Sequence, residues 1–238
     1  MPQIGKRMRA ARERVDRERM YELPDAVTLV KDTATAKFDE TVELHLNTGL
    51  DGRHADQQIR GSVTMPHGLG RIMRVAVFAE GEAVQLAIDA GADEVGSDDL
   101  IDKIAGGDVN FDAVIAQREL MGKVGRLGRI LGPRGLMPNP RSNTVLDAAD
   151  IPRAVQEARA GRVEFRLDRT NVVHCHVGKV SFTDEDLLDN LATLVSEIVK
   201  AKPSGAKGNY IRGATLTSTM GPGVPLDVRT MLALASEA

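Results

Sequence analysis

The sequence predicts a mixed α/β fold in two domains, with the second inserted into the first. Strands that alternate apolar and polar residues, and so bury one face, occur early and late in the chain, near residues 40–46 and 163–167. Between them, short apolar strands alternate with helices, which is typical of a small parallel sheet. We therefore expect a discontinuous first domain of half-buried strands and helices, residues 1–67 and 161–238, and an inserted small Rossmann-like parallel α/β domain, residues 68–160.

Four elements are predicted before the insertion. A basic helix comes first, and Pro24 with Asp25 opens a second helix, because proline is favoured at the first helical position. Two strands follow, of which the first has the clearest alternation. The predicted bounds are 3–20 and 24–35 for the helices, and 40–46 and 59–65 for the strands.

The inserted segment alternates strands with helices. Gly91 ends its first helix, and Gly106-Gly107 follows its second. Strands are predicted over 72–79, 92–95 and 113–116, helices over 82–90, 98–105 and 151–160, and a Gly- and Pro-rich loop over 122–140.

The chain then returns to the first domain. A second alternating strand is followed by another strand and by a clearly amphipathic helix, which Thr183 is placed to cap. The predicted bounds are 163–167, 173–180 and 211–219 for strands, and 184–200 for the helix.

Charge is distributed unevenly along the chain. The 238 residues carry a formal net charge of −3, whereas RNA-binding domains are usually basic. Residues 80–112 hold ten acidic residues and one lysine, so the rest of the chain is basic, most clearly in segments 1–19, 118–145 and 200–212. Because polyanion binding depends on local potential more than on the net sum, this distribution is compatible with RNA binding.

The motifs of common nucleotide-binding enzymes are missing. Gly68-Leu69-Gly70 precedes a strand, whereas a dinucleotide-binding motif follows one. A phosphate-binding loop around Gly122-Lys123 fails at Gln117 and at Val124. We therefore expect no enzymatic activity and no cofactor.

Cys175 is the single cysteine, so no internal disulfide can form. In His174-Cys175-His176 the two histidines share one face of a predicted strand, so at most two of the three side chains could reach one ion, and we expect no metal site. No apolar run is long enough to span a bilayer and the N-terminus has no secretory signal. We expect a cytoplasmic protein with no membrane partner.

Two regions have the composition of a polyanion-binding surface. In the segment 125–140, glycines allow backbone N–H groups to approach phosphate, and arginines supply charge. Segments 202–210 and 215–223 combine small residues, hydroxyls and lysines, which suits contacts to the ribose and phosphate of folded RNA. The residues alone predict a two-domain α/β protein that binds a polyanion.

These segments also resemble a known family. The strings KFDETVELHL (37–46), ADQQIRGSVTMPHG (55–68), VGRLGRILGPRGLMPNP (124–140) and STMGPGV (218–224) closely resemble, in order, those of the universal L1 family of large-subunit ribosomal stalk proteins, bacterial type. The resemblance covers nearly the whole chain. It implies a ribosomal protein that binds a stem-loop junction of large-subunit ribosomal RNA at a mobile stalk. It also implies contact with exit-site transfer RNA, with help in its release, and, in many members, repression of their own messenger RNA.

The resemblance implies that the first domain supplies the main RNA contacts. Phe38 and Met220 would pack on ribose or base faces, and Glu40 would accept a hydrogen bond from a ribose hydroxyl or orient a neighbour. The candidates in the first domain are Lys37, Phe38, Glu40, Thr41, Lys179, Lys207, Tyr210, Thr217, Ser218, Thr219, Met220 and Gly221, and the secondary candidates in the second are Arg129, Arg134 and Asn139.

Two other classes of protein remain open. A nucleotide-dependent α/β enzyme would need a phosphate-binding loop after the first strand of the middle domain, where Glu80 and Glu82 would repel phosphate. A protein-interaction scaffold would use the acidic segment 80–112.

Two features also depart from the family pattern: the net acidity, and the histidines His174 and His176 where a more apolar run is expected.

Overall fold

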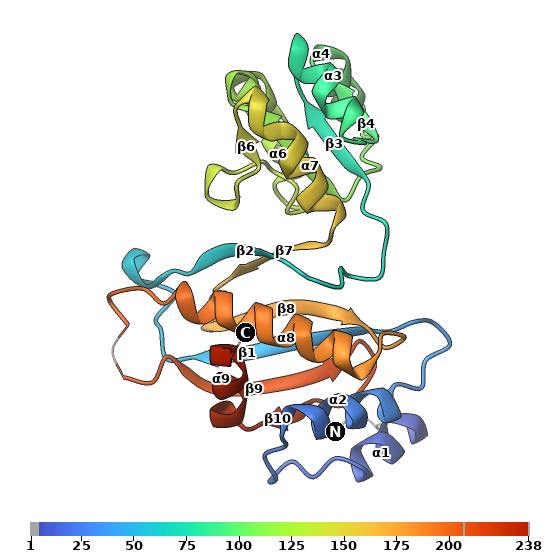
Figure 1. The fold of residues 1–238 in the computed structure, drawn as a ribbon, viewed down its shortest axis with the longest axis vertical. Coiled ribbons are helices and arrows are strands. Elements are labelled where there is room, and N and C mark those ends of the chain that lie inside the picture. The colour runs from blue at the N-terminus through green and yellow to red at the C-terminus, as the bar shows by residue number, and fades with distance from the viewer. Residues whose placement is uncertain (1–4, 207, 238) are drawn as a thin grey trace. The chain divides into compact units, whose positions relative to one another are not determined.

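The computed structural model of the chain describes residues 5–206 and 208–237. The chain forms two compact units, each with its own core. The first unit holds the residues up to Gly70 and those from Val163 onward, and the second unit holds Arg71–Arg162. One four-stranded sheet is antiparallel and the other is parallel, so the predicted mixed α/β class is confirmed (Figure 1).

An antiparallel sheet forms the centre of the first unit. In spatial order its strands are β10 (Val224–Leu226), β9 (Ile211–Ser218), β1 (Thr41–Thr48) and β8 (Val172–Lys179). Val42, Leu44 and Leu46 of β1 are buried, whereas the residues between them are only partly buried. The alternating sequence thus places one face of the sheet in the core, as predicted.

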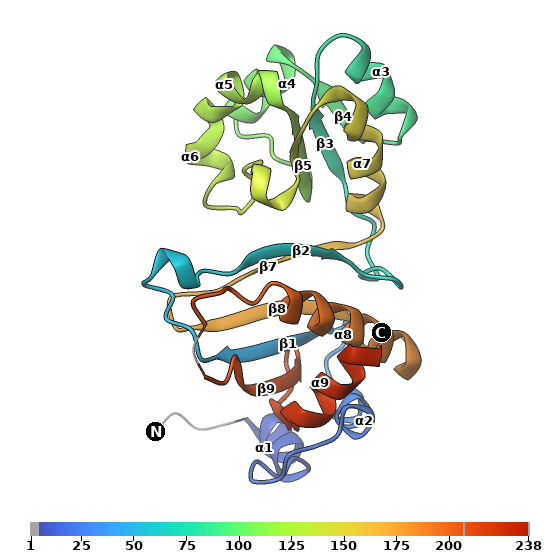
Figure 2. The same ribbon diagram turned by 60° about the vertical axis from the view of Figure 1, so that its left-hand side comes forward.

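Three helices cover this buried face: α2 (Leu23–Thr33), α8 (Asp184–Lys200) and α9 (Val228–Glu237) (Figures 1 and 2). In α8, Leu187, Leu191 and Leu194 are fully buried at helical spacing. Thr183 caps α8 as predicted. Its hydroxyl accepts a hydrogen bond from the Asp186 N–H, and the Asp186 carboxylate accepts one from the Thr183 N–H.

Two further strands, β2 (Arg60–Thr64) and β7 (Arg162–Arg166), form a two-stranded sheet where the chain leaves the first unit and returns to it. A short 3-10 helix, η1 (Ala55–Gln57), precedes β2. Gly61 packs against the buried Phe165 ring, and a Cβ at position 61 would lie 2.4 Å from Phe165 Cζ, so the ring would have to shift.

A parallel sheet forms the centre of the second unit. Its strands, in spatial order, are β4 (Glu94–Gly96), β3 (Val75–Phe78), β5 (Ala113–Gln117) and β6 (Val145–Leu146). The helices packed on one face are α3 (Glu82–Asp89) and α7 (Ile151–Arg159). Those on the other face are α4 (Asp98–Ala105), α5 (Met121–Val124) and α6 (Gly128–Leu131). Single 3-10 turns are η2 (Arg118–Leu120), η3 (Gly125–Leu127), η4 (Pro140–Ser142) and η5 (Ala148–Asp150).

The predicted basic helix over 3–20 is wrong in extent. The structure has one helix there, α1 (Lys6–Glu13), and residues 1–4 lie outside the described part of the chain. Beyond α1 the backbone turns, because Asp16 N–H donates to the Tyr21 hydroxyl and the Asp16 carboxylate accepts from Glu18 N–H. Only Ala11 of α1 is buried, so this charged segment has too small an apolar face to sustain a longer helix.

The predicted loop over 122–140 is helical in its first half. Val124, Leu127 and Leu131 recur at helical spacing and are buried in the core, so α5, η3 and α6 form despite the glycines between them. The strands β6 and β10 and the helix α9 were not predicted.

Candidate RNA-binding surface

A buried carboxylate, Glu40, lies at the centre of the candidate surface and is 2% exposed. Its Oε1 accepts a hydrogen bond from the Ala36 N–H at 2.9 Å, and its Oε2 accepts from the Ser218 hydroxyl at 2.7 Å and the Met220 N–H at 2.8 Å. Burial acts to raise the pKa of Glu40, but the three hydrogen bonds outweigh burial and hold the pKa below its ordinary value. Glu40 is therefore an ionised group that ties the segment before β1 to the end of β9.

The turn after β9 is fixed against β1. Thr219 N–H donates to the carbonyl of Thr41, and Thr41 N–H donates to the Thr219 hydroxyl, both at 3.0 Å. Gly221 lies so close to Ser218 that a Cβ at position 221 would stand 2.4 Å from the Ser218 Oγ. Met220 is 47% exposed. The turn thus has a rigid backbone and an outward methionine.

Thr217 belongs to the same turn and is partly buried. Its hydroxyl donates to the carbonyl of Ser218 at 3.0 Å, with the carbonyls of Gly221 and Pro222 at 3.4 and 3.3 Å. Because the hydroxyl is already shared inside the turn, its present contribution is to shape the backbone.

An aromatic ring and an ammonium group lie at the same end of the sheet. Phe38 is 56% exposed and borders an open pocket of about 350 Å³ with Ala34, Ala36, Asp39, Glu40, Val180 and Ser181. Lys179 Nζ donates to the Thr41 hydroxyl at 2.9 Å, and Lys37 is exposed beside Phe38. A flat ring, a thioether and cationic groups on one edge are suited to sugar and phosphate contacts.

Tyr210, another predicted contact, has a buried side chain. It is 9% exposed, and its hydroxyl donates to the carbonyl of Ile198 at 2.8 Å. Burial raises the pKa of Tyr210 to about 12. The ring anchors the segment before β9 to the end of α8. The predicted contact Lys207 lies outside the described residues.

The secondary candidates are in the second unit. Arg129 of α6 and Arg134 after it are exposed, whereas Asn139 is partly buried. The backbone of Asn139 holds the next turn, since its N–H donates to the Thr144 hydroxyl at 2.7 Å. The two arginines are thus available to a polyanion, and the asparagine has a visible structural role.

The strand ends at which a parallel sheet would bind a nucleotide are occupied by an ion-pair network. Lys123 Nζ lies 3.1 Å from the carboxylate of Glu80 and 3.0 Å from that of Asp98. Hydrogen bonds from Ser97 and then from Lys123 lower the pKa of Glu80. Lys123, the cationic side chain that could bind a phosphate at these strand ends, is thus paired with two carboxylates.

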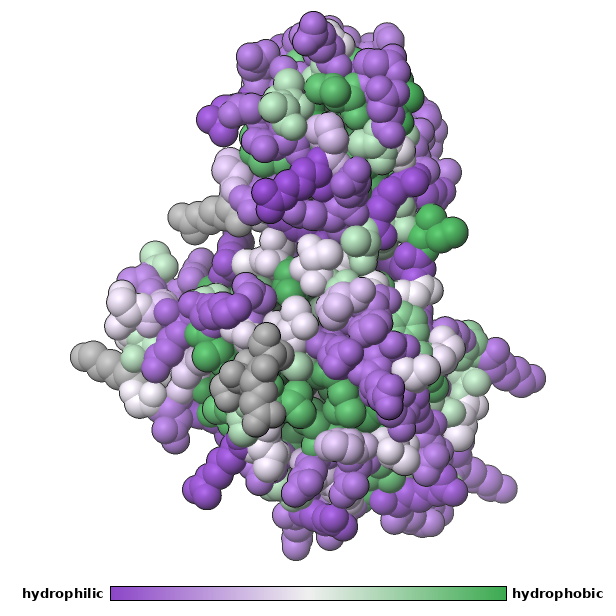
Figure 3. Space-filling model, viewed as in Figure 1, coloured by the Kyte–Doolittle hydropathy of each residue, from purple (hydrophilic) through white to green (hydrophobic). Residues whose placement is uncertain are grey.

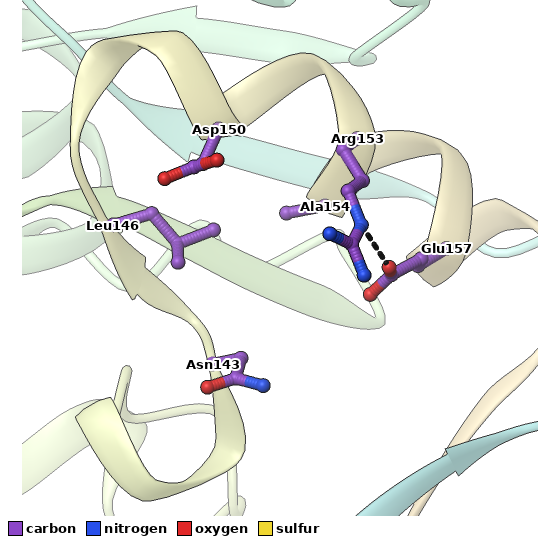
Figure 4. A pocket seen from close by; sticks show the side chains of 6 residues that line it. All are labelled: Asn143, Leu146, Asp150, Arg153, Ala154 and Glu157. Atoms are coloured by element: carbon purple, nitrogen blue, oxygen red, sulfur yellow. Dashed lines mark hydrogen bonds and ion pairs between the residues drawn. The ribbon is translucent and has the colours of Figure 1, made fainter.

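A small pocket beside α7 has no phosphate-binding character either (Figure 4). Its volume is about 190 Å³, and Asn143, Leu146, Asp150, Arg153, Ala154 and Glu157 line it. Arg153 Nε lies 2.8 Å from a Glu157 oxygen, so the only cationic group among these residues is paired with a carboxylate (Figure 4).

The histidines of β8 share one face of the strand, as predicted. His174 and His176 are exposed, and Cys175 between them is buried, which raises the pKa of its thiol to about 12. No group of three histidine, cysteine or carboxylate side chains that could hold a metal ion is found in the part of the chain that the structure describes. The sequence analysis did not single out His45, whose ring contacts that of His174 on the neighbouring strand. The alternation of β1 could have shown that His45 lies on the polar face of the sheet.

The second unit shows mainly hydrophilic side chains in one view, with smaller hydrophobic areas between them (Figure 3). Among the described residues, no helix has the length and apolar character needed to cross a membrane.

Comparisons with known proteins agree on one family. The family model described as "Ribosomal protein L1p/L10e family" matches residues 30–222. A protein of Chloroflexus aggregans named large ribosomal subunit protein uL1 is 57% identical, over 96% of this chain and 97% of its own length. Proteins of the same name from Chloroflexus aurantiacus and Thermomicrobium roseum are 57% and 54% identical, over 95% and 97% of this chain and 96% of their own lengths. The chain therefore belongs to the ribosomal protein L1 family, whose members are non-enzymatic, RNA-binding constituents of the large ribosomal subunit in the cytoplasm.

Proposed function

We propose that this chain binds large-subunit ribosomal RNA through one edge of the first unit, the contact edge, and so forms part of the ribosomal stalk. The contact edge consists of Lys37, Phe38, Thr41, Lys179, Thr217, Thr219, Met220 and Gly221. The observation that carries the proposal is the Glu40 carboxylate, which holds the backbone on both sides of this edge in place. A surface that is rigid before binding loses less conformational entropy when RNA docks.

The chemistry of the contact edge favours folded RNA over a featureless polyanion. Phe38 and Met220 offer apolar contact to ribose or base faces, and both are large side chains that stay exposed in the free protein. Lys37 and Lys179 supply the charge that attracts phosphate, and Lys179 is also oriented by Thr41. Recognition would therefore combine shape and charge.

We further propose two roles that the family resemblance suggests. In the first, the protein contacts exit-site transfer RNA and assists its release, with the exposed Arg129 and Arg134 of the second unit as candidates for a further RNA contact. In the second, the contact edge binds a similar fold in the protein's own messenger RNA and represses its translation. A messenger that uses the same edge would compete with ribosomal RNA for the protein.

The test is RNA binding by Met220→Asp, which places a carboxylate against phosphates. The probe is the large-subunit ribosomal RNA of the source organism, transcribed in vitro. Met20→Asp is the matched control, because Met20 is also exposed and is next to Tyr21, which bridges Leu226 at the end of β10. We expect Met220→Asp to lose at least about tenfold in affinity, or 1.4 kcal/mol, and Met20→Asp to bind as the parent does. Equal binding by both variants, with the fold intact by circular dichroism, would refute the contact edge.

A second experiment separates RNA binding from a protein-interaction scaffold that uses the acidic segment 80–112. Size-exclusion chromatography of the parent with and without the transcript should show a stable complex. If no complex forms, the RNA-binding proposal fails and the scaffold is favoured.

A further inference from the structure

The face of the first unit's sheet that lies opposite the helices carries three histidines in two adjacent rungs. In the register of β1 and β8, His45 lies opposite His174, and Glu43 lies opposite His176. On the other side of β1, Thr215 and Thr217 of β9 lie opposite His45 and Glu43. We call His45, His174, His176 and Glu43 the histidine face.

The side chains of the histidine face form one connected group. His45 Nδ1 and His174 Nδ1 are 2.8 Å apart, and the two rings meet edge to face at a centroid distance of 4.9 Å. The carboxylate of Glu43 lies between two of the histidines, with its oxygens 3.7 Å from His45 Nε2 and 3.7 Å from His176 Nδ1. The outer nitrogen of His174 is 3.6 Å from Asp168. The side chains of His174 and His176 are 54% and 63% exposed, so a ligand can reach them.

The histidine face continues directly from the contact edge. Thr41 is two residues before Glu43 and therefore points to the same side of the sheet, and its partner across β8 is Lys179. Other charged groups near the histidines are Glu43 from β1, Asp168 from the turn between β7 and β8, and Lys179 at the end of β8; β9 presents the neutral Thr215 and Thr217. An RNA chain that leaves the contact edge along the sheet would meet the imidazoles next.

We propose that RNA bound at the contact edge also lies across the histidine face, and that the complex takes up protons there. This inference rests on the proposed RNA-binding function and adds a second part to its surface. The partner is the phosphate backbone of the same RNA, because protonated imidazoles donate hydrogen bonds to phosphate from both ring nitrogens.

Charge explains why proton uptake accompanies binding. With neutral rings, the carboxylates of Glu43 and Asp168 and the ammonium group of Lys179 sum to a formal charge of −1, which repels phosphate; two protons would bring the sum to +1. Burial, and then the neighbouring His174, lowers the pKa of His45, so the free protein resists protonation at this ring. Phosphate supplies the missing counter-charge and favours the protonated rings in the complex. Affinity must then rise as the pH falls through the range in which histidine titrates.

The hydrogen bond between His45 and His174 limits the number of protons. It needs one Nδ1 as donor and the other as acceptor, so it survives one proton on the pair and is lost with two. The exposed His176 has no such restriction. We therefore expect uptake of one to two protons on binding.

The test measures RNA affinity from pH 8.0 to pH 5.5 at constant ionic strength, with the full chain, the ribosomal RNA transcript and a chelator to exclude bridging metals. The variants are the double variant His174→Gln with His176→Gln, the single variant His45→Gln, and the control His54→Gln. His54 is exposed beside Asp51 in the loop before η1 and is not one of the residues of the histidine face. Calorimetry in buffers of different ionisation enthalpy counts the protons directly.

We expect the affinity of the parent and of His54→Gln to rise by about tenfold or more between pH 8.0 and pH 5.5, since one proton taken up gives up to tenfold per pH unit. The double variant should lose most of this dependence on pH. His45→Gln should show a smaller loss. Circular dichroism at each pH controls for unfolding.

Two outcomes would overturn the inference while leaving the proposed function intact. One is a parent that binds the transcript with the same affinity at every pH. The other is a double variant that keeps the pH dependence of the parent. If the parent binds no transcript, or Met220→Asp binds like the parent at every pH, the proposed function itself fails.

Discussion

At the scale of single residues, Glu40 is the group on which the contact edge depends most. It satisfies one hydroxyl and two backbone N–H donors, and hydrogen bonds to a charged acceptor are stronger than neutral ones. We expect Glu40→Gln to lower the free energy of unfolding by about 1–3 kcal/mol and to weaken RNA binding, because an amide keeps the shape but places an N–H against a donor. Urea unfolding and RNA titration of the same preparation measure both effects.

The loss of unfolding free energy in Glu40→Gln should depend on pH in a direction that follows from the pKa of Glu40. The pKa of Glu40 is held below its ordinary value of 4.5 in the folded protein, so the carboxylate contributes stability above pH 4.5 that is lost as the pH falls through the folded pKa. Glutamine does not titrate. The difference in unfolding free energy between parent and Glu40→Gln should therefore shrink between pH 7 and pH 3, and a difference that grows in acid would contradict the role of the charge.

Gly221 offers a sharper test of the turn geometry. A Cβ at this position would lie 2.4 Å from the Ser218 Oγ, and Ser218 is the buried donor to Glu40. Gly221→Ala should therefore disturb the Glu40 hydrogen bonds and reduce RNA affinity by about tenfold. Gly213→Ala is the matched control, because a Cβ on that glycine of β9 meets nothing within 4 Å. Similar affinity losses in both variants would show that the effect is not specific to the turn.

The sequence alone indicated only part of the proposed contact edge, because segment 215–223 has the composition of an RNA-binding surface but does not show which of its side chains are exposed. Phe38 and Met220 are two of several apolar residues, and their exposure depends on hydrogen bonds that join positions 178 to 180 residues apart. The family resemblance supplied the candidate residues, and Tyr210 was among them. Nothing in the sequence shows that the Tyr210 hydroxyl reaches the carbonyl of Ile198 at the end of α8.

At the scale of elements, α8 shows how local sequence determines a boundary. Thr183 and Asp186 form reciprocal hydrogen bonds at its N-terminus. We expect Thr183→Ala to lower the unfolding free energy by about 1 kcal/mol. Thr193→Ala, which removes a hydroxyl bonded only to the preceding turn, should change it by less. Urea unfolding followed by circular dichroism distinguishes the two, and equal losses would argue against the cap.

Asn190 of α8 joins the segment after β2 to strand β8. This fully buried side chain accepts from the His67 N–H and donates to the carbonyls of Gly68 and Val177. We expect Asn190→Ala to cost about 2–4 kcal/mol of unfolding free energy, because it leaves buried polar groups without partners.

His67→Gln is the comparison for Asn190→Ala. It removes the contacts of the His67 ring with the carboxylates of Asp186 and Asp189, which are at least partly exposed to solvent, and should cost less than about 1 kcal/mol. If His67→Gln were the more damaging of the two, the segment would be held by charge and not by the buried amide.

Elements with a strong periodic pattern were predicted well, and weakly patterned ones were not. The helices over 98–105 and 184–200 have the predicted bounds, because their apolar residues recur at helical spacing between clear end signals. The two-residue strand β6 and the three-residue strand β10 are too short to show a period. They exist because neighbouring strands offer them partners, which is information that lies elsewhere in the chain.

At the scale of the whole molecule, the uneven charge has a structural counterpart. The acidic segment 80–112 lies entirely in the second unit, whereas the contact edge and the histidine face lie in the first. RNA binding at the contact edge depends on the charges close to it, because exposed charges are screened over about 8 Å at physiological salt. Local potential decides where the RNA docks.

The first unit has the residues it needs to fold and bind RNA without the second. The core of the first unit is built from its own residues on both sides of the insertion, and the contact edge uses none from the second unit. Because β2 pairs with β7, the chain ends that remain after removal of the second unit lie on neighbouring strands and can be joined by a short Gly-Ser linker. We expect residues 1–67 joined to 161–238 to fold and to bind the ribosomal RNA transcript within about threefold of the full chain, which is less than 1 kcal/mol. Circular dichroism and thermal unfolding check the fold, and titration checks affinity. A folded first unit that does not bind the transcript would show that the second unit supplies contacts the RNA cannot do without, and Arg129 and Arg134 would then be the first residues to mutate.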